Sequence, residues 1–155
     1  MTFVIRPMTE ADASAVASWH YAEEYSFYDA DADADDLAEL LDPAEWGRRY
    51  FAVDDAEAEL VGFFVFKVSD HVAEIGLGLR PDLTGVGLGG SVLDAGMQYA
   101  AARFDVRSYV LAVAAFNHRA ITVYERAGFQ VTDRYDHETN GGMHPFVRMA
   151  RLENS

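Results

Sequence analysis

The chain has 155 residues, half of them hydrophobic, which is enough to bury one core and predicts a single domain over residues 1–155. Its formal net charge of −14 argues against nucleic acid and anionic membrane surfaces as partners. Because the sequence contains no cysteine, disulfides, a thiolate nucleophile and cysteine-ligated zinc are excluded. Residues 1–7 lack the basic flank and apolar core of a signal peptide, so we expect a cytoplasmic protein.

The spacing of apolar residues predicts an alternation of strands and helices. In chain order we expect a strand over 2–6, a helix from 9 to about 21, a largely irregular stretch over 23–36, a helix over 35–41, strands over 50–53, 60–68 and 72–79, a helix over 89–103, a strand over 108–114, a helix over 117–127, and a final hairpin of strands 129–135 and 146–152. Thr9 followed by Asp12 resembles a helix N-cap, and Gly128 closes the last helix.

A glycine-rich turn joins the strand over 72–79 to the helix that begins at Gly89. Glycines at 85, 87, 89 and 90 remove side chains from the turn, so backbone N–H groups and the helix N-terminus can approach a ligand closely. The helix dipole favours an anion here, and we expect a diphosphate. The structural alternative is a tight turn that needs glycine only for positive φ angles.

A dinucleotide-binding turn is one alternative for this segment. Gly85, Gly87 and Gly90 fit the pattern G-x-G-x-x-G, and Asp105 lies near the position of a ribose-binding acid. That fold requires repeated strand–helix–strand units, whereas consecutive strands precede this turn. We therefore disfavour an oxidoreductase that uses a nucleotide cofactor.

Two motifs carry a resemblance to the GNAT family of N-acetyltransferases, which spans about residues 2–150. The family loop Gln/Arg-x-x-Gly-x-Gly/Ala follows the fourth strand, and here Gly87 and Gly89 fill its glycine positions while Thr84 replaces Gln or Arg. The later motif is carried by Asn117, Ala120, Tyr124, Gly128 and Phe129. The resemblance implies an α/β (α+β) fold, with a mixed, mostly antiparallel sheet of about seven strands flanked by about four helices.

The resemblance also implies an activity. We expect transfer of the acetyl group of acetyl-CoA, a co-substrate, to a primary amine of a small molecule, peptide or protein, without a metal. The alternative is a regulatory module that binds acyl-CoA with little or no transfer. The oligomeric state stays open, and a homodimer is one option.

The resemblance assigns the CoA-binding residues to the strand, the glycine turn and the later helix. They are Leu77, Gly78, Leu79, Thr84, Gly85, Val86, Gly87, Leu88, Gly89, Gly90, Ser91, Asn117 and Tyr124. Free backbone groups of the strand over 75–79 are placed to pair with the pantetheine arm. Gly76 and Gly78 within this strand predict a bulge or a close ligand approach.

Tyr124 is the expected general acid. It lies two helical turns after Asn117, so both side chains can face the same side, and a phenol is protonated at neutral pH. The resemblance gives this tyrosine the role of protonating the departing thiolate, while packing in the core is the structural alternative. Glu74 is the expected base, with His20 and His144 as alternatives.

The expected acceptor-binding residues are aromatic and polar residues of two regions, the segment over 19–36, which we name the first loop, and the last hairpin. They are Trp19, His20, Tyr21, Tyr25, Phe27, Tyr28 and Asn140. Residues 29–36 carry five acids, so this region can attract a cationic amine by charge and cation–π interactions. The alternatives are that the aromatic residues cover the core and that the acids form a solvated face.

Overall fold

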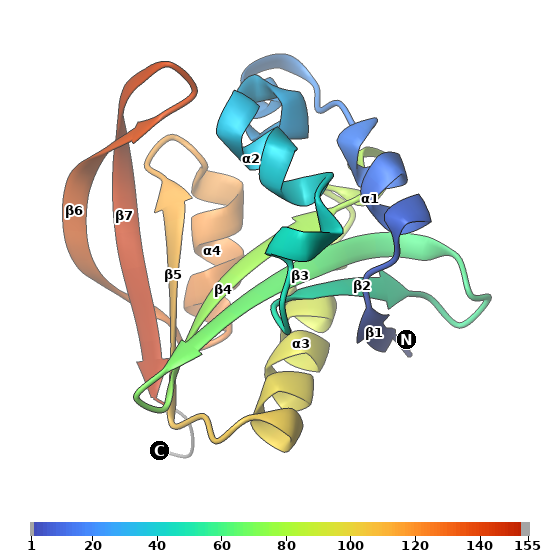
Figure 1. The fold of residues 1–155 in the computed structure, drawn as a ribbon. Helices are drawn as coiled ribbons and strands as arrows, with labels where there is room; N and C mark the ends of the chain where they lie inside the picture. The colour runs from blue at the N-terminus through green and yellow to red at the C-terminus, as the bar shows by residue number, and fades with distance from the viewer. Residues whose placement is uncertain (1, 153–155) are drawn as a thin grey trace.

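The computed structural model describes residues 2–152, which form a seven-stranded sheet in the order β1-β2-β3-β4-β5-β7-β6 (Figure 1). The strands are β1 (Val4–Pro7), β2 (Tyr50–Asp54), β3 (Leu60–Ser69), β4 (Val72–Leu79), β5 (Ser108–Ala114), β6 (Gln130–Thr139) and β7 (Gly142–Leu152). Every neighbouring pair is antiparallel except β4 and β5, which are parallel. The predicted fold class is confirmed.

Four α-helices and several short 3₁₀ segments connect the described strands. The helices are α1 (Glu10–Ala17), α2 (Ala34–Leu40), α3 (Gly89–Arg103) and α4 (His118–Arg126), and the 3₁₀ segments are η1 (Glu23–Tyr28), η2 (Ala30–Ala32), η3 (Pro43–Glu45) and η4 (Pro81–Leu83). Helices α3 and α4 lie on one side of the sheet and α1 and α2 on the other (Figure 1). Within residues 2–152, no helix is both long and apolar enough to cross a bilayer.

Strand β3 contributes to two apolar clusters, because its successive side chains point to opposite faces. Phe64 and Phe66 are buried in the main core together with Val92 of α3. Phe63 and Val65 point the other way and pack against the cluster that contains Trp19. One face of the sheet is therefore buried over its inner strands under α3 and α4, and α1 and α2 cover part of the other face.

The first helix begins as expected and ends earlier than expected. Thr9 and Asp12 form a capping box, in which each side chain accepts a hydrogen bond from the other residue's backbone N–H. The helix ends at Ala17, not near Tyr21. The following stretch, expected to be largely irregular, contains the two short 3₁₀ segments η1 and η2.

The final hairpin is longer than its sequence suggests. Strands β6 and β7 pair from Gln130 opposite Ala150 to Thr139 opposite Gly142, around the two-residue turn Asn140–Gly141, where φ is 50° and 79°. Two successive positive φ angles are typical of a type I′ turn, which matches the twist of the strands. The prediction ended the first strand at Tyr135 because most side chains of β6 are exposed, so no buried alternation marks its second half.

Strands β4 and β5 pair at only one end. Their register runs from Val72 opposite Ser108 to Glu74 opposite Val110, and beyond this point the two strands diverge (Figure 1). On its other edge, β4 pairs with β3 along its whole length. The result is a gap in the sheet that opens toward the carboxyl ends of both strands.

The bulge that Gly76 and Gly78 led us to expect is absent from the regular pairing of β3 with β4. Gly78 instead makes room for a neighbouring ring, because an added Cβ would lie 2.4 Å from Cε1 of Phe63. At Gly76 an added Cβ would make only ordinary contacts with Val65. Glycine at 78 is therefore explained by packing.

Gly96 of α3 is expected to be essential for the main core. An added Cβ would lie 2.2 Å from Cζ of Phe64, a ring with no solvent exposure, so Gly96→Ala should lower the free energy of unfolding by about 1–3 kcal/mol. Urea denaturation measures this change. Gly90→Ala, in the first turn of the same helix with nothing within 4 Å of its Cβ, is the control and should be close to neutral. Equal stability of the two variants would contradict the tight fit of Phe64.

Candidate active site

The gap between β4 and β5 exposes backbone hydrogen-bonding groups. The N–H of Arg80 donates to the carbonyl of Val61 at 2.8 Å, toward β3. Because these directions alternate along an antiparallel strand, the N–H and C=O groups of Leu77 and Leu79 point the other way, into the gap. The N–H and C=O groups of Leu77 and the N–H of Leu79 fit the expected contacts with a pantetheine arm, whereas the carbonyl of Leu79 already accepts a hydrogen bond from Tyr21.

Two tyrosines of the segment between α1 and α2 reach the opposite edges of this gap. The hydroxyl of Tyr21 donates to the carbonyl of Leu79 on β4 at 2.6 Å. On β5, the N–H of Ala114 donates to the hydroxyl of Tyr28 at 3.1 Å. The first loop is thereby tied to both diverging strands, which is a role that the aromatic composition of this loop did not reveal.

The glycine turn has the geometry of an anion site. Gly85 and Gly87 have φ angles of 74° and 86°, and an ideal Cβ on Gly87 would have nothing within 4 Å. Helix α3 begins after Leu88 with no hydrogen bond from a capping side chain, so its first N–H groups remain available for an anion. The hydroxyl of Thr84 donates to the carbonyl of Pro81 at 2.8 Å, so this side chain stabilises its own turn.

Asn117 and Tyr124 lie beside the first loop. Asn117 is buried and caps α4, with its Oδ1 accepting from the N–H of Ala120 at 3.1 Å, and its side chain also bonds to the hydroxyl of Tyr28. Tyr124 packs its ring against Phe129, with 6.2 Å between centroids. Burial raises the pKa of Tyr124 above its ordinary value of 10, and the neighbouring Tyr28 adds to the rise. Tyr124 therefore keeps its proton at neutral pH.

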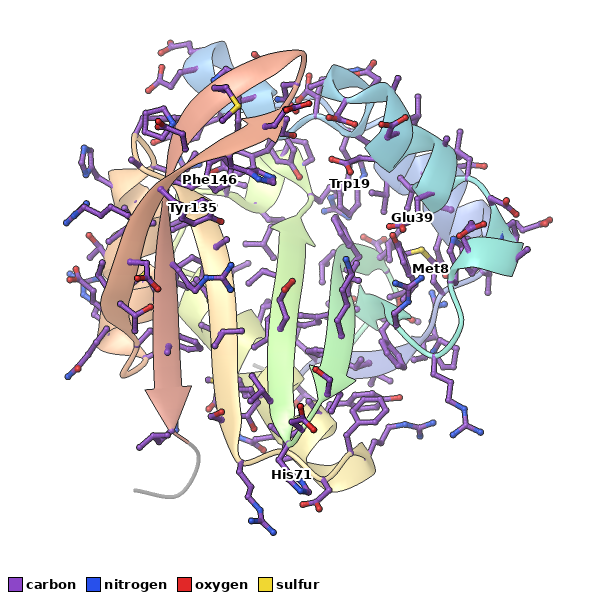
Figure 2. The ribbon with its side chains drawn as sticks, turned by 60° about the vertical axis from the view of Figure 1, so that its left-hand side comes forward. Met8, Trp19, Glu39, His71, Tyr135 and Phe146 are labelled. Atoms are coloured by element: carbon purple, nitrogen blue, oxygen red, sulfur yellow. The ribbon has the colours of Figure 1, made fainter. Side chains whose placement is uncertain are left out.

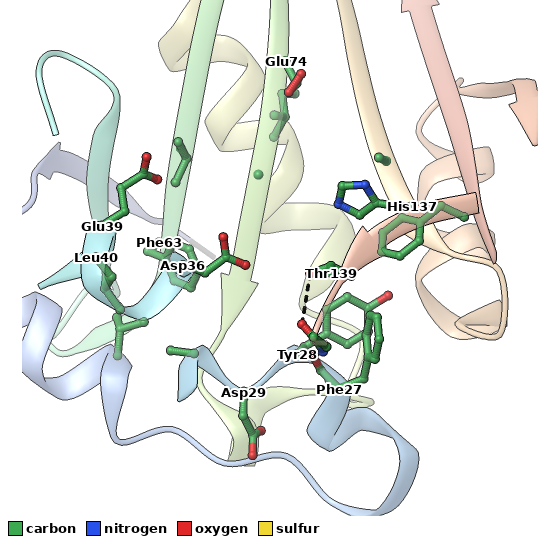
Figure 3. A pocket seen from close by; sticks show the side chains of 18 of the residues that line it. Phe27, Tyr28, Asp29, Asp36, Glu39, Leu40, Phe63, Glu74, His137 and Thr139 are labelled. Atoms are coloured by element: carbon green, nitrogen blue, oxygen red, sulfur yellow. Dashed lines mark hydrogen bonds between the residues drawn. The ribbon is translucent and has the colours of Figure 1, made fainter. Parts of the chain in front are cut away.

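A cavity of about 700 Å³ adjoins the gap on the face of the sheet toward α1 and α2 (Figure 3). Among the expected acceptor residues, those that line it are Trp19, Tyr21, Phe27, Tyr28 and Asn140. His20 and Tyr25 are not among the lining residues. Trp19 and Glu39 flank β4 on one side, and Tyr135 and Phe146 of the hairpin flank it on the other (Figure 2).

The cavity also contains Asp36, which belongs to the acidic run over 29–36 noted in the sequence, and charged residues that sequence reasoning missed. Asp36 and Glu39 come from one face of α2, and the cationic residues are Lys67 and Arg148. Burial raises the pKa of Asp36, and the nearby carboxylates of Asp33 and Glu39 raise it further. Glu39 accepts a hydrogen bond from the hydroxyl of Tyr50. The three-residue spacing of Asp36 and Glu39 was the available signal, since such residues share a helix face.

Glu74 is the only one of the three proposed bases that lines the cavity. It stands on β4 at one end of the cavity, away from the acids of α2 (Figure 3). His20 is exposed and pairs with Asp31 at 3.1 Å, and this hydrogen bond raises the pKa of His20. His144 packs against Phe27 with 4.9 Å between ring centroids, and its enclosed Nε2 has no hydrogen-bond partner within residues 2–152.

One group of potential metal ligands comes together although the sequence spacing did not suggest it. Ligand atoms of His20, Asp29 and Asp31 lie within 4.8 Å of one another. These groups already have partners, because His20 pairs with Asp31 and Asp29 accepts from the N–H of Tyr21 at 2.8 Å. We therefore interpret His20, Asp29 and Asp31 as residues that stabilise the conformation of the first loop by these hydrogen bonds.

Comparison with known proteins agrees with this geometry. The family described as acetyltransferase (GNAT) domain matches residues 2–130. Mycothiol acetyltransferase of Streptomyces coelicolor is 34% identical over 119 residues, which cover 75% of this chain and 37% of that protein. The same enzyme of Streptomyces scabiei is 37% identical over 122 residues, covering 76% and 37%. The chain thus spans little more than a third of the length of these relatives.

The fold is also similar to that of a solved enzyme. The crystal structure of spermidine N-acetyltransferase from Vibrio cholerae, in complex with CoA and spermine, matches with a TM-score of 0.74 and 21% identity over 97% of this chain and 95% of that one. At this identity the likeness concerns the fold alone. With the family match over most of the sequence, and with the diverging strands and glycine turn described above, the chain belongs to the GNAT acetyltransferase family.

Proposed function

We propose that this protein is an N-acetyltransferase that transfers the acetyl group of acetyl-CoA to a primary amine, and that residues 1–155 act as one domain. The observation that carries the proposal is the continuity of three features. The anion-binding turn at Gly85–Gly90 leads into the gap beside Leu77 and Leu79, and this gap adjoins the cavity that contains Glu74. A phosphate end, an arm site and an acceptor site are thus connected in that order.

The chemistry of the available groups fits CoA. The uncapped N–H groups at the start of α3 and the turn glycines would hold its diphosphate, and the backbone of Leu77 and Leu79 would hold its amide-bearing arm. Bound acetyl-CoA would supply the activated acetyl thioester. A turn that needed glycine only for its φ angles would not require α3 to begin without a capping side chain.

The proposed proton transfers use two residues of different character. Tyr124, whose pKa is raised by burial, keeps its proton and can donate it from its hydroxyl to a departing thiolate. The carboxylate of Glu74 faces the acceptor cavity and accepts the proton of the incoming ammonium, so that the amine becomes nucleophilic. The C–N bond then forms at the acetyl carbonyl and the C–S bond breaks, and the second proton lost by the nitrogen restores the hydroxyl of Tyr124 through solvent. Asn117 holds the start of α4 and thereby helps to place Tyr124.

The acceptor that fits the cavity best is a cation. Four carboxylates line the cavity (Asp29, Asp36, Glu39 and Glu74), against two cationic side chains (Lys67 and Arg148). Aromatic faces from Trp19, Phe27 and Tyr28 add cation–π attraction. Spermidine, the substrate in the name of the Vibrio cholerae enzyme, belongs to this class.

The experiment that tests the proposal is amide formation from acetyl-CoA across a panel of amines, detected by mass spectrometry alongside CoA release. The panel pairs a diamine with a monoamine of equal length that ends in a methyl group, and adds an amino sugar and a peptide N-terminus. Amide formation that is most efficient with the diamine is the expected result. Tight CoA binding without amide formation from any amine would favour the regulatory alternative.

Glu74→Gln should lower the rate of acetyl transfer near neutral pH on the order of 10²-fold, because glutamine cannot accept the ammonium proton. The loss should shrink as the pH rises, since amines deprotonate unaided in alkaline solution. The measurement is a pH profile of single-turnover amide formation. Glu57→Gln, in the exposed β2–β3 turn, is the control. A loss that is equal at every pH would assign Glu74 to positioning of the acceptor.

A further inference from the structure

Arg119 brings a positive charge to the glycine turn. It is the second residue of α4, and its Nη1 lies 3.1 Å from the position that a Cβ on Gly85 would take. The guanidinium therefore lies directly against the backbone of the turn. Glycine at 85 permits this approach, and its φ of 74° allows the turn to curve around the arginine.

The ring of Tyr25 holds the guanidinium from another side. The Cζ of Arg119 lies 4.2 Å from the centroid of Tyr25, a distance typical of a cation–π contact. Tyr25 in turn packs against Phe116 at 6.0 Å between centroids. Phe116 lies just before α4, so the ring of Tyr25 is supported by the segment that leads into the helix carrying Arg119.

No carboxylate neutralises Arg119 within residues 2–152, whereas Arg6 and Arg80 are both paired with aspartates. Among the described residues, Arg6 and Arg80 are the only arginines with such ion pairs, so Arg119 is distinguished by its position against the glycine turn. An exposed arginine that is held by a ring and lacks an anionic partner can bind an external anion.

We propose that Arg119 binds a phosphate group of CoA at the glycine turn, and that Tyr25 positions its guanidinium. The inference rests on the proposed function and identifies the cation that Thr84 does not provide. Thr84 is uncharged, stands where the family has Gln or Arg, and donates its hydroxyl to Pro81. Arginine suits this task because its donors match the oxygens of a phosphate.

The proposal changes the role of Tyr25. The sequence placed this residue with the acceptor site, but it does not line the cavity and instead contacts Arg119. The 3₁₀ segment η1 thereby reaches the cofactor side through Tyr25 and the acceptor side through Phe27. Tyr25 is a positioning residue for the phosphate contact.

Calorimetric titration of CoA into the full chain at low salt tests the proposal. Arg119→Gln should weaken CoA binding about 10–100-fold, since hydrogen bonds to charged groups are among the stronger ones. Arg107→Gln, at the opposite end of β5 from the glycine turn, is the matched control and should bind as the wild type does. Tyr25→Leu, which removes the ring, should weaken CoA binding less than Arg119→Gln does. Tyr25→Phe should bind CoA as the wild type does, because phenylalanine keeps the ring face that contacts the guanidinium.

A second titration with 3′-dephospho-CoA identifies the phosphate. If Arg119 contacts the diphosphate, Arg119→Gln weakens both ligands equally, and if it contacts the 3′-phosphate, the variant and the wild type bind dephospho-CoA alike. Wild-type CoA affinity in Arg119→Gln would overturn the inference and leave the proposed function standing. Absence of CoA binding by the wild type would overturn both.

Discussion

Tyr124→Phe should slow single-turnover acetyl transfer about 10²–10⁴-fold while leaving CoA affinity nearly unchanged. Phenylalanine keeps the packing of the ring against Phe129 and removes only the hydroxyl. That hydroxyl matters once negative charge develops on the leaving sulfur, so its loss affects the chemical step more than binding. The raised pKa of Tyr124 means that the donor form persists throughout the neutral and mildly alkaline range.

The control for Tyr124→Phe is the same substitution at a tyrosine that is remote from the proposed active site. Tyr99→Phe removes a hydroxyl from α3, where the ring packs against Phe51, and should react at the wild-type rate. Rapid mixing of enzyme with acetyl-CoA and amine measures the chemical step, and circular dichroism checks the fold. An unchanged rate in Tyr124→Phe would make this residue a packing residue, and loss of rate in Tyr28→Phe instead would move the role to Tyr28.

Gly87→Val should weaken CoA binding by about tenfold or more, because a β-branched residue at a φ of 86° costs on the order of 1–3 kcal/mol of backbone strain, which the free protein relieves by moving the turn out of its binding conformation. The new side chain would also stand where the backbone N–H groups of the turn face a phosphate. It would not clash with the protein, since an ideal Cβ at this position has nothing within 4 Å. Calorimetry with CoA measures the change.

Gly47→Val provides a matched control. Gly47 also has a positive φ of 55°, and the nearest atom to its ideal Cβ is 4.0 Å away, but it lies in the segment before β2. This variant should lose some stability and bind CoA normally. Wild-type affinity in a folded Gly87→Val protein would contradict the assignment of the glycine turn to phosphate binding.

Local sequence signals were sufficient for the strands and helices that carry strong periodicity or glycine density. The strand Val72–Leu79, the turn at Gly85–Gly90 and the helix Gly89–Arg103 stand in the structure as expected. The capping residue Thr9 was also identified from its spacing to Asp12. These features depend on residues that are close together in the chain, which is why they can be inferred without tertiary information.

Features that depend on distant contacts were not predictable in the same way. The carboxylates of Asp36 and Glu39 line the cavity only because α2 packs over the same face of the sheet from which Glu74 lines it. Tyr25 looked equivalent to Tyr28 in sequence, yet the 3₁₀ turn of η1 directs one ring to Arg119 and the other hydroxyl to Ala114. A 3₁₀ segment without buried residues leaves no periodic pattern from which this difference could be read.

The central claim is that acetyl-CoA binds along the glycine turn and the gap between β4 and β5. Amide-resolved NMR with CoA as the titrant tests it most directly, because each backbone N–H in the proposed site reports separately. We expect the largest shifts at Leu77, Leu79, Gly85 and Gly87 and in the first turn of α3, with little change at the β3–β4 turn around Asp70. Largest shifts in the groove near Arg126 and Arg151, or no shifts at the glycine turn, would contradict the claim.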